Sequence, residues 1–231
     1  MEAAMLEVRG LTAAYGKAQI LFGVDFDATA GEVVALLGRN GAGKSTTLKR
    51  IMGLLPPRTG EIRFDGARLD HLPAYRIARL GIGYVPEERR IFTDLTVREN
   101  LEVGRQPARA GAAHWTTDRL FDLFPHLGRM QTRLGGRMSG GEQQMLALAR
   151  TLMGNPRAIL LDEPAEGLAP IVVEQVATVI RELKSQGLCV LLCEQNLRFA
   201  RQVADRACLL EQGRIVVTGT LAAVQSQFEL A

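Results

Sequence analysis

A glycine-rich segment between an apolar run and a helical pattern constrains the fold of this chain more than any other feature. Residues 33–37 form the apolar run, and leucine and isoleucine recur at helical spacing after the segment, up to Leu55. The segment fits the pattern G-x-x-x-x-G-K-[ST], in which a loop between a buried strand and a helix holds a phosphate group. Its residues are Gly38, Arg39, Asn40, Gly41, Ala42, Gly43, Lys44, Ser45 and Thr46. The sequence therefore predicts an α/β fold built on a phosphate-binding loop.

The chemistry of a phosphate site explains the composition of this loop. Glycine tolerates backbone angles that other residues avoid, so consecutive N–H groups can turn inward around a phosphate. The positive end of the following helix adds to this attraction. We expect Lys44 to contact the β- and γ-phosphates of a nucleotide, and the hydroxyl of Ser45 to bind a magnesium ion. A glycine-rich turn with a surface lysine is the plainer alternative.

Composition limits the remaining possibilities. A chain of 231 residues buries roughly 70% of its unfolded surface, enough for one large core with an inserted lobe. The net charge of +3 comes from interspersed residues and does not indicate nucleic acid. Three cysteines lie in apolar segments and are expected to be buried thiols in a reducing compartment. No apolar run reaches the ~18 residues of a membrane span, and Glu2 and Glu7 argue against an export signal, so we expect a cytoplasmic protein.

The N-terminal part of the sequence predicts a small antiparallel sheet. Apolar and polar residues alternate in 6–8 and again in 24–28, and residues 61–66 have the pattern of a strand and a hairpin turn. Tyr15 lies in the turn between the first two strands, upstream of the phosphate loop. It either stacks on the base of the nucleotide or packs as a core tyrosine, and the sequence leaves both interpretations open.

A mostly helical segment interrupts the α/β core. Thr96 and Glu99 have the spacing of a capping box, and the apolar period of residues 118–127 predicts another helix. The Pro-, Ala- and Gly-rich connection 106–113 between them is expected to be flexible. The predicted division of the single domain 1–231 is a nucleotide-binding core, 1–87 and 154–231, and a helical subdomain, 88–153.

Two carboxylates follow a second buried strand. Asp162 comes after four apolar residues and, in a parallel sheet, lies at the same edge as the phosphate loop. It is expected to hold magnesium opposite Ser45. Glu163 is expected to project to the other side of the strand and to polarise the water that attacks the γ-phosphate. The alternative is a strand that merely ends in a solvated turn.

A third motif opens a helix near the end of the helical segment. Ser139 and Glu142 again have capping-box spacing, and the simplest interpretation is a helix that starts well. Gly140 and Gly141 in its first turn each cost about 1 kcal/mol relative to alanine. They are better explained if the backbone approaches a ligand closely, as an anion at a helix N-terminus requires. The four residues are therefore candidate ligand-binding residues.

Beside the two nucleotide motifs, Met138–Glu142 resembles the signature segment of the ATP-binding cassette (ABC) family. The resemblance extends from about Leu6 to Gly219, and it implies ATP hydrolysis with ATP and Mg²⁺ bound. In that family two cassettes close head to tail, and each ATP lies between one chain's phosphate loop and the other chain's signature. The resemblance therefore implies that Ser139 and Gly141 act on nucleotide held by a second cassette, and that a lone monomer is inactive.

Three positions depart from the pattern that is common in the family. Glu87 stands where many members have a glutamine after Tyr-Val-Pro, and its carboxylate is still expected to reach the magnesium ion or the attacking water. Gln195 replaces a histidine; its amide can donate to the γ-phosphate but cannot titrate, which leaves Glu163 as the main candidate for activating water. Ala169 replaces an aspartate that is usual at the interface between cassettes.

With these departures, the sequence resembles the second ATP-binding subunit of bacterial importers for branched-chain amino acids. The segments that carry the likeness are 84–87, 139–144, 166–170 and 194–196. The resemblance implies a peripheral protein on the cytoplasmic face of the inner membrane. It also implies as partners a second, non-identical cassette, two transmembrane permease subunits and, indirectly, a solute-binding protein, with no nucleic acid. Importers of urea or short amides have similar cassettes, so the cargo stays open.

Two functions from other classes compete with transport. A cassette that acts on nucleic acid or ribosomes usually has two cassettes or a coiled-coil insertion, and neither is visible, nor is a basic stripe. A module that senses ATP without hydrolysing it is suggested by Gln195 and opposed by Glu163. Arg89 and Arg90 are interpreted as a solvated face in preference to a contact for a permease or an acidic partner, and His126 is expected to have a surface or packing role.

Overall fold

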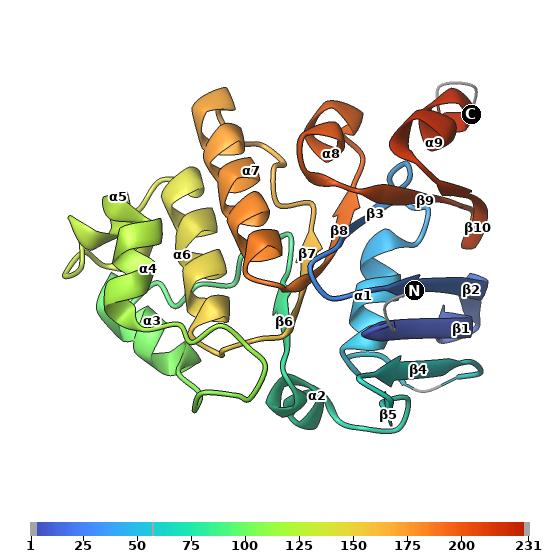
Figure 1. The fold of residues 1–231 in the computed structure, drawn as a ribbon, viewed down its shortest axis with the longest axis horizontal. Coiled ribbons are helices and arrows are strands. Elements are labelled where there is room, and N and C mark those ends of the chain that lie inside the picture. The colour runs from blue at the N-terminus through green and yellow to red at the C-terminus, as the bar shows by residue number, and fades with distance from the viewer. Residues whose placement is uncertain (1–3, 57, 229–231) are drawn as a thin grey trace.

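The computed structural model describes residues 4–56 and 58–228. These residues form a six-stranded sheet, a four-stranded sheet and a group of helices beside them (Figure 1). This is the predicted α/β architecture, with an N-terminal antiparallel sheet and an inserted helical subdomain. Within the described ranges, no helix combines the length and the hydropathy that crossing a membrane requires.

The larger sheet positions the predicted nucleotide residues. Its strand order is β10-β9-β3-β8-β7-β6, and all neighbouring strands are parallel except β9 and β10. Its strands are β3 (Val33–Leu37), β6 (Ile82–Val85), β7 (Ala158–Asp162), β8 (Cys189–Glu194), β9 (Arg206–Glu211) and β10 (Arg214–Gly219). Every residue of β3, β7 and β8 is buried, because both faces of the sheet are covered. The carboxyl ends of these three strands meet at one edge.

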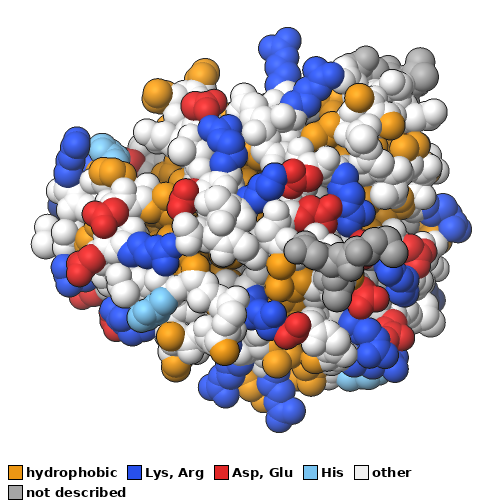
Figure 2. Space-filling model, viewed as in Figure 1, with side chains coloured by type: hydrophobic (Ala, Val, Ile, Leu, Met, Phe, Trp, Pro, Cys, Tyr) orange, Lys and Arg blue, Asp and Glu red, His pale blue; other side chains and the backbone are white. Residues whose placement is uncertain are grey.

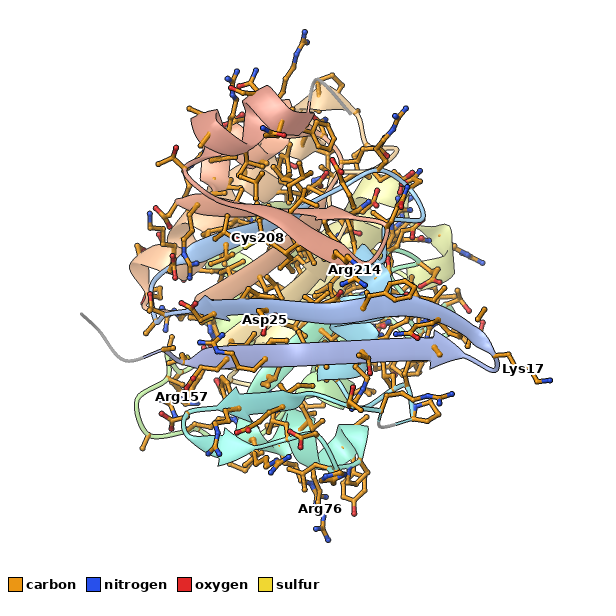
Figure 3. All side chains as sticks on the ribbon, turned by 90° about the vertical axis from the view of Figure 1, so that its right-hand side faces the viewer. Lys17, Asp25, Arg76, Arg157, Cys208 and Arg214 are labelled. Atoms are coloured by element: carbon orange, nitrogen blue, oxygen red, sulfur yellow. The ribbon has the colours of Figure 1, made fainter. Side chains whose placement is uncertain are left out.

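The smaller sheet covers the helix that follows the phosphate loop. It is antiparallel, with the order β2-β1-β4-β5. Its strands are β1 (Leu6–Tyr15), β2 (Ala18–Ala28), β4 (Glu61–Phe64) and β5 (Ala67–Arg68). Figure 3 looks onto this sheet, with Lys17 at the turn between β1 and β2. Helix α1 (Lys44–Ile51) shares one core with both sheets, which fixes the phosphate loop between them.

The helical subdomain differs from its sequence prediction in one element. It contains α3 (Val97–Gly104), α4 (Thr117–Leu123), α5 (Pro125–Gly128), the short 3₁₀ helix η1 (Gly135–Arg137) and α6 (Gly140–Leu152). The single helix predicted over 118–127 is wrong, because Phe124 leaves the helical conformation before Pro125, whose ring restricts the preceding residue. The capping box of Thr96 and Glu99 is confirmed at the start of α3. The division into 1–87, 88–153 and 154–231 stays a prediction.

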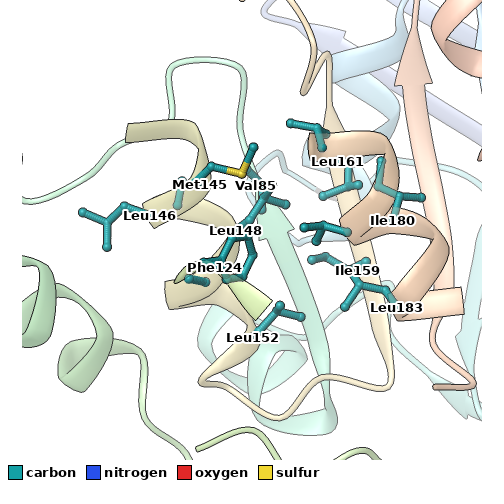
Figure 4. Close-up of a cluster of buried hydrophobic side chains, with 14 of the residues drawn as sticks. Val85, Phe124, Met145, Leu146, Leu148, Leu152, Ile159, Leu161, Ile180 and Leu183 are labelled. Carbon is teal, nitrogen blue, oxygen red and sulfur yellow. The ribbon is translucent and has the colours of Figure 1, made fainter. Parts of the chain in front are cut away.

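A shared core joins the subdomain to the larger sheet. The remaining helices are α2 (Ala74–Leu80), α7 (Pro170–Ser185), α8 (Leu197–Val203) and α9 (Leu221–Phe228). Figure 4 shows Met145 and Leu148 of α6 facing β7 and α7, where Ile159, Leu161 and Ile180 lie. These side chains are almost fully buried. Their packing therefore fixes the position of α6 relative to the sheet edge at which β3, β7 and β8 end. The three cysteines are buried and free, as predicted.

Candidate nucleotide-binding site

The phosphate loop connects β3 to α1 in a conformation that needs glycine. Gly41 and Gly43 have positive φ values of 84° and 111°, which residues with a Cβ rarely adopt. Gly38 is needed for space, because a Cβ atom there would lie 2.5 Å from the carbonyl oxygen of Leu210 in β9. The loop is therefore shaped by its glycines and supported by the neighbouring strand.

Lys44 is buried under the loop, with 4% of its surface exposed. Its ammonium group donates to the carbonyl oxygens of Gly38 at 2.8 Å and Arg39 at 3.2 Å. It also forms an ion pair with Glu163, with Nζ 3.0 Å from Oε1. A charge of either sign is costly to bury alone, so this pair stabilises both groups.

Ser45 and Asp162 are brought together as the sequence predicts. The Ser45 hydroxyl donates to Oδ1 of Asp162 at 2.9 Å, and the Tyr84 hydroxyl of β6 donates to Oδ2 at 3.2 Å. Burial raises the pKa of Asp162, and the two hydrogen bonds oppose that rise. Sequence reasoning missed Tyr84, although it stands in a strand that runs parallel to β7 and ends at the same edge.

The predicted direction of Glu163 is wrong. Strand β7 ends at Asp162, and Glu163 has a positive φ of 46°, so the alternation of side chains along a strand no longer applies. The left-handed backbone turns Glu163 toward Lys44 instead of the opposite face. Asp162 and Glu163 therefore both contact the start of α1, where Ser45 and Lys44 are adjacent.

Two further carboxylates surround this edge. Burial raises the pKa of Glu166, and the negative charges of Glu163 and Glu87 raise it further. Glu87 also acts on Asp162, so it lies within electrostatic reach of the site although its side chain is exposed. The structure thus places Glu87 beside the pair of acids.

Gln195 and Tyr15 are less engaged than the other candidates. Both are exposed, and within the described residues neither side chain hydrogen-bonds to the phosphate loop. Tyr15 is 47% exposed, so the alternative of a core tyrosine does not hold. Its position leaves the ring free to stack on a base.

Glu194, at the end of β8, is a buried acid that sequence reasoning missed. Only 3% of its surface is exposed, and its Oε1 atom has no hydrogen-bond partner among the described residues. Burial raises its pKa to about 7; the backbone N–H of Asn196 counteracts this rise, and the charge of Glu163 adds to it. Glu194 directly follows the apolar residues of the strand, so the sequence pattern predicts an exposed residue at the strand end, whereas β8 stays buried through Glu194.

The signature segment, Met138–Glu142, begins α6. Ser139 is the N-cap: its Oγ accepts the N–H of Glu142 at 3.3 Å, and the Glu142 carboxylate accepts the N–H of Ser139 at 2.7 Å. His126 lies 2.9 Å from the other carboxylate oxygen, a contact that sequence reasoning missed. Burial opposes ionisation of Glu142, but these hydrogen bonds outweigh it and lower the pKa. The predicted capping box is confirmed.

Each glycine of the signature segment is packed by a side chain. A Cβ atom on Gly141 would lie 2.9 Å from Cγ2 of Val172 in α7, and one on Gly140 would lie 2.9 Å from Nη1 of Arg89. Close packing is therefore a second reason for glycine at Gly141, whereas at Gly140 the flexible end of Arg89 could move aside. The interpretation of Arg89 and Arg90 as a solvated face holds for Arg90, which is exposed, and only in part for Arg89, whose guanidinium lies against α6 with its Nε buried.

The donor atoms at the edge of the sheet fit a magnesium ion that also binds phosphate. A hydroxyl and a carboxylate are hard oxygen ligands, and Mg²⁺ usually takes only one or two protein carboxylates besides phosphate and water. In the part of the chain that the structure describes, no group of three or more His, Cys, Asp or Glu side chains could hold a metal by itself. Ser45 and Asp162 therefore fit an ion that arrives with a nucleotide.

Charges on the face drawn in Figure 2 do not separate by sign. Figure 2 shows Lys and Arg side chains interspersed with Asp and Glu over the visible face. This distribution matches the sequence, in which 28 basic and 25 acidic residues are mixed. The visible face therefore has no basic patch of the kind that a nucleic-acid backbone requires.

Comparison with known proteins gives consistent similarities. A sequence model of the family described as "ABC transporter" matches residues 21–166. The chain is 44% identical to the high-affinity branched-chain amino acid transport ATP-binding protein BraG of Pseudomonas aeruginosa, over 95% of this chain and 94% of the relative. It is 37% identical to the lipopolysaccharide export system ATP-binding protein LptB of Escherichia coli, over 94% and 91%. A solved ATP-binding subunit of an ABC transporter superposes with a TM-score of 0.83 and 32% identity, covering 98% of this chain and 94% of that structure.

Proposed function

This chain belongs to the ABC transporter family, and we propose that it powers the import of branched-chain, apolar amino acids. Family membership makes it an ATP-binding and ATP-hydrolysing subunit of a transporter, and not a sensor that leaves ATP intact. The observation that carries the proposed cargo is the 44% identity to BraG over nearly the full length of both chains.

The proposed site holds ATP through the phosphate loop, 38–46. Its N–H groups and Lys44 bind the phosphates, and the exposed Tyr15 stacks on the base. Ser45 and Asp162, which are hydrogen-bonded to each other, would hold Mg²⁺, with Glu87 beside them. The ion, when bound, supplies positive charge that offsets the phosphate oxygens.

Glu163 is the proposed general base. It accepts a proton from the water that attacks the γ-phosphate, while the Gln195 amide donates a hydrogen bond to that phosphate. The ion pair between Lys44 and Glu163 suggests how the site responds to ATP. Once the phosphates attract Lys44, Glu163 loses its partner and can accept a hydrogen bond from water.

The signature segment is proposed to act on a second, non-identical cassette. Ser139 and Gly140 are exposed at the start of α6, where a helix N-terminus favours an anion. Head-to-tail closure would bring them, with Gly141 and Glu142, onto ATP in the other cassette. The γ-phosphate then favours the closed state, and its loss favours opening.

A groove between the core and the helical subdomain is the proposed contact for the permeases. It encloses about 500 Å³ and contains three aromatic and three arginine side chains. These side chains are Tyr75, Arg79, Tyr84, Arg90, Phe92 and Arg150. Such a lining suits a helix that carries apolar and acidic groups. Because Tyr84 also hydrogen-bonds Asp162, movement in the groove has a direct path to the proposed metal ligand.

The complete assembly would contain two such permease subunits and, indirectly, a solute-binding protein. This chain would then lie on the cytoplasmic face of the cell membrane. A second cargo is kept because the chain is also 37% identical to LptB, whose name describes lipopolysaccharide export. That likeness leaves export as an alternative direction of transport. Urea or a short amide stays an alternative cargo because the sequence also resembles cassettes of those importers.

Uptake of labelled leucine in the source cell tests the proposal. The cell's own copy is replaced by Glu163→Gln at equal protein level, with the parent sequence as control. Loss of leucine uptake with growth otherwise normal would support both the role of Glu163 and the cargo. Unchanged leucine uptake would contradict the cargo, and labelled urea and export of lipopolysaccharide would be measured next.

A further inference from the structure

Arg89 has no visible partner for its charge. Within residues 4–56 and 58–228 its side chain makes no hydrogen bond or ion pair, although its Nε atom is buried. The neighbouring Arg150 has a buried, unpartnered Nη1 as well, but its Nη2 donates to the carbonyl oxygen of Arg90 at 2.7 Å and its guanidinium stacks over Phe92. The buried Nε–H of this guanidinium has lost water and gained no acceptor, and an anion bound by the guanidinium would offset that cost.

The guanidinium lies against the start of α6. The Cβ position of Gly140 is 2.9 Å from Nη1 of Arg89 and 3.6 Å from Nη2. The first turn of a helix carries partial positive charge, so a cation at this place is repelled rather than stabilised. The one acidic residue of that turn, Glu142, is already engaged by Ser139 and His126.

The chain holds Arg89 in this place at a conformational cost. Arg89 and Arg90 have positive φ values of 63° and 48°, a conformation that residues with a Cβ adopt only at a cost in free energy. Two hydrogen bonds hold this turn. The Arg89 N–H donates to the Pro86 carbonyl oxygen at 2.9 Å, and the Arg150 guanidinium donates to the Arg90 carbonyl oxygen. Strained residues that the surroundings hold in place are concentrated at functional sites.

We propose that Arg89 binds the γ-phosphate of the ATP held by a second cassette, beside Ser139 and the free N–H groups of α6. The N–H groups of Gly140 and Gly141 have no acceptor among the described residues, so three kinds of donor converge on one place. A guanidinium can bind two phosphate oxygens at once and stabilise the charge that they carry during transfer. Arg89 is thereby a catalytic residue for the partner's ATP, and the proposal rests on the head-to-tail arrangement proposed above.

The test uses a complex of two cassettes in which this chain carries Lys44→Ala and the other cassette is intact. Turnover by this chain's own phosphate loop is then removed, and the remaining phosphate release comes from the loop that faces this chain's signature segment. Arg89→Gln, Arg89→Lys and Ser139→Ala are added singly to this background. Arg137→Gln is the matched control, because Arg137 is an exposed arginine two positions before Ser139.

We expect Arg89→Gln to lower kcat about 10- to 100-fold, with a much smaller change in KM for ATP. Arg89→Lys should lie between this variant and the parent, because an ammonium keeps the charge but loses the planar fork. Arg137→Gln should stay near the parent. If Arg89→Gln fails to fold, as thermal unfolding would reveal, Arg89→Lys decides: reduced kcat supports the proposal, and parental kcat overturns it.

The Ser139→Ala variant separates failure of this proposal from failure of the arrangement on which it rests. If Ser139→Ala lowers kcat and Arg89→Gln does not, the head-to-tail arrangement stands and the role of Arg89 is overturned. If neither variant lowers kcat, the arrangement itself fails and the role of Arg89 fails with it. If Arg89→Gln lowers turnover in a chain with Lys44 intact but not in the Lys44→Ala background, Arg89 acts within its own chain and the proposal is overturned.

Discussion

The two ends of the molecule that are proposed to hold nucleotide differ in how their side chains are paired. At the phosphate-loop end, Lys44 contacts Glu163 at 3.0 Å and Ser45 contacts Asp162 at 2.9 Å. At the signature end, formed by Arg89 and residues 139–141, the serine is exposed and the arginine has no acceptor within the described ranges. The first end is assembled within one chain, whereas the second presents donors that need an anion from elsewhere. Contacts within the chain therefore identify only the phosphate-loop end as a site.

Glu163→Gln is the strongest test of the difference between the phosphate-loop end and the signature end. If the phosphate-loop end contains the general base, phosphate release should fall by at least about 100-fold, because an amide cannot accept the proton. Binding of a fluorescent ATP analogue should persist, since Lys44 and the loop are intact. Both are measured on the two-cassette complex.

A neighbouring acid provides the control for this variant. Glu166 belongs to the same group of carboxylates but does not pair with Lys44. Glu166→Gln is therefore expected to change turnover far less than Glu163→Gln. Turnover near the parental value in Glu163→Gln would show that water is activated elsewhere and would remove the main distinction between the two ends.

The phosphate-loop end also predicts a dependence of stability on pH. Burial, with the charge of Glu163 adding to it, raises the pKa of Glu194 to about 7. A carboxyl with a raised pKa stabilises the fold below its unfolded pKa, and that contribution disappears as the pH rises through 7. Between pH 5 and pH 8, the free energy of unfolding of the parent should fall relative to Glu194→Gln by up to about 3 kcal/mol. Urea unfolding at several pH values measures this, and parallel curves for the two proteins would contradict it.

Sequence reasoning succeeded where function depends on local pattern. The phosphate loop, the strand that ends at Asp162 and the capping box of Ser139 each depend on residues within a few positions of one another. Proline restricts the residue before it, so Pro125 predicts a helix break, whereas the apolar period of 118–127 favours one continuous helix; the structure follows the proline.

The missed features depend on tertiary structure or on backbone conformation. The contact of Arg89 with Gly140 joins segments that are distant in sequence, and the hydrogen bond of Tyr84 to Asp162 depends on which strand lies beside β7. The direction of Glu163 follows from a left-handed φ that no motif encodes for glutamate. The signature end was therefore harder to predict than the phosphate-loop end.

Tyr84→Phe tests whether metal binding at the phosphate-loop end depends on the hydrogen bond from Tyr84 to Asp162. The Tyr84 hydrogen bond lowers the pKa of Asp162, so its loss should let protons compete better with the metal. We expect the Mg²⁺ concentration for half-maximal ATPase activity to rise about tenfold, and more at pH 6.5 than at pH 8. Magnesium titration at fixed ATP measures the effect. An unchanged titration would mean that Asp162 is positioned by Ser45 alone.

The smallest expected effect on stability compares two equivalent capping boxes. Ser139 with Glu142 begins α6, and Thr96 with Glu99 begins α3 by the same pair of hydrogen bonds. Ser139→Ala and Thr96→Ala should each lower the free energy of unfolding by about 1 kcal/mol, because each leaves one N–H of the first helical turn without its cap. Equal losses in urea unfolding would show that the two boxes do the same structural work.

The two boxes should differ only when ATP draws two cassettes together. With Glu163→Gln present to keep ATP intact, light scattering measures association with the second cassette as ATP is added. Ser139→Ala should weaken this association and Thr96→Ala should not, because only Ser139 stands at the signature end beside Arg89 and Gly140. If both variants weaken association equally, the loss follows from helix stability and Ser139 has no contact with nucleotide. If only Ser139→Ala weakens association, the donors of the signature end contact nucleotide held by the second cassette, across an interface that is absent from a single chain.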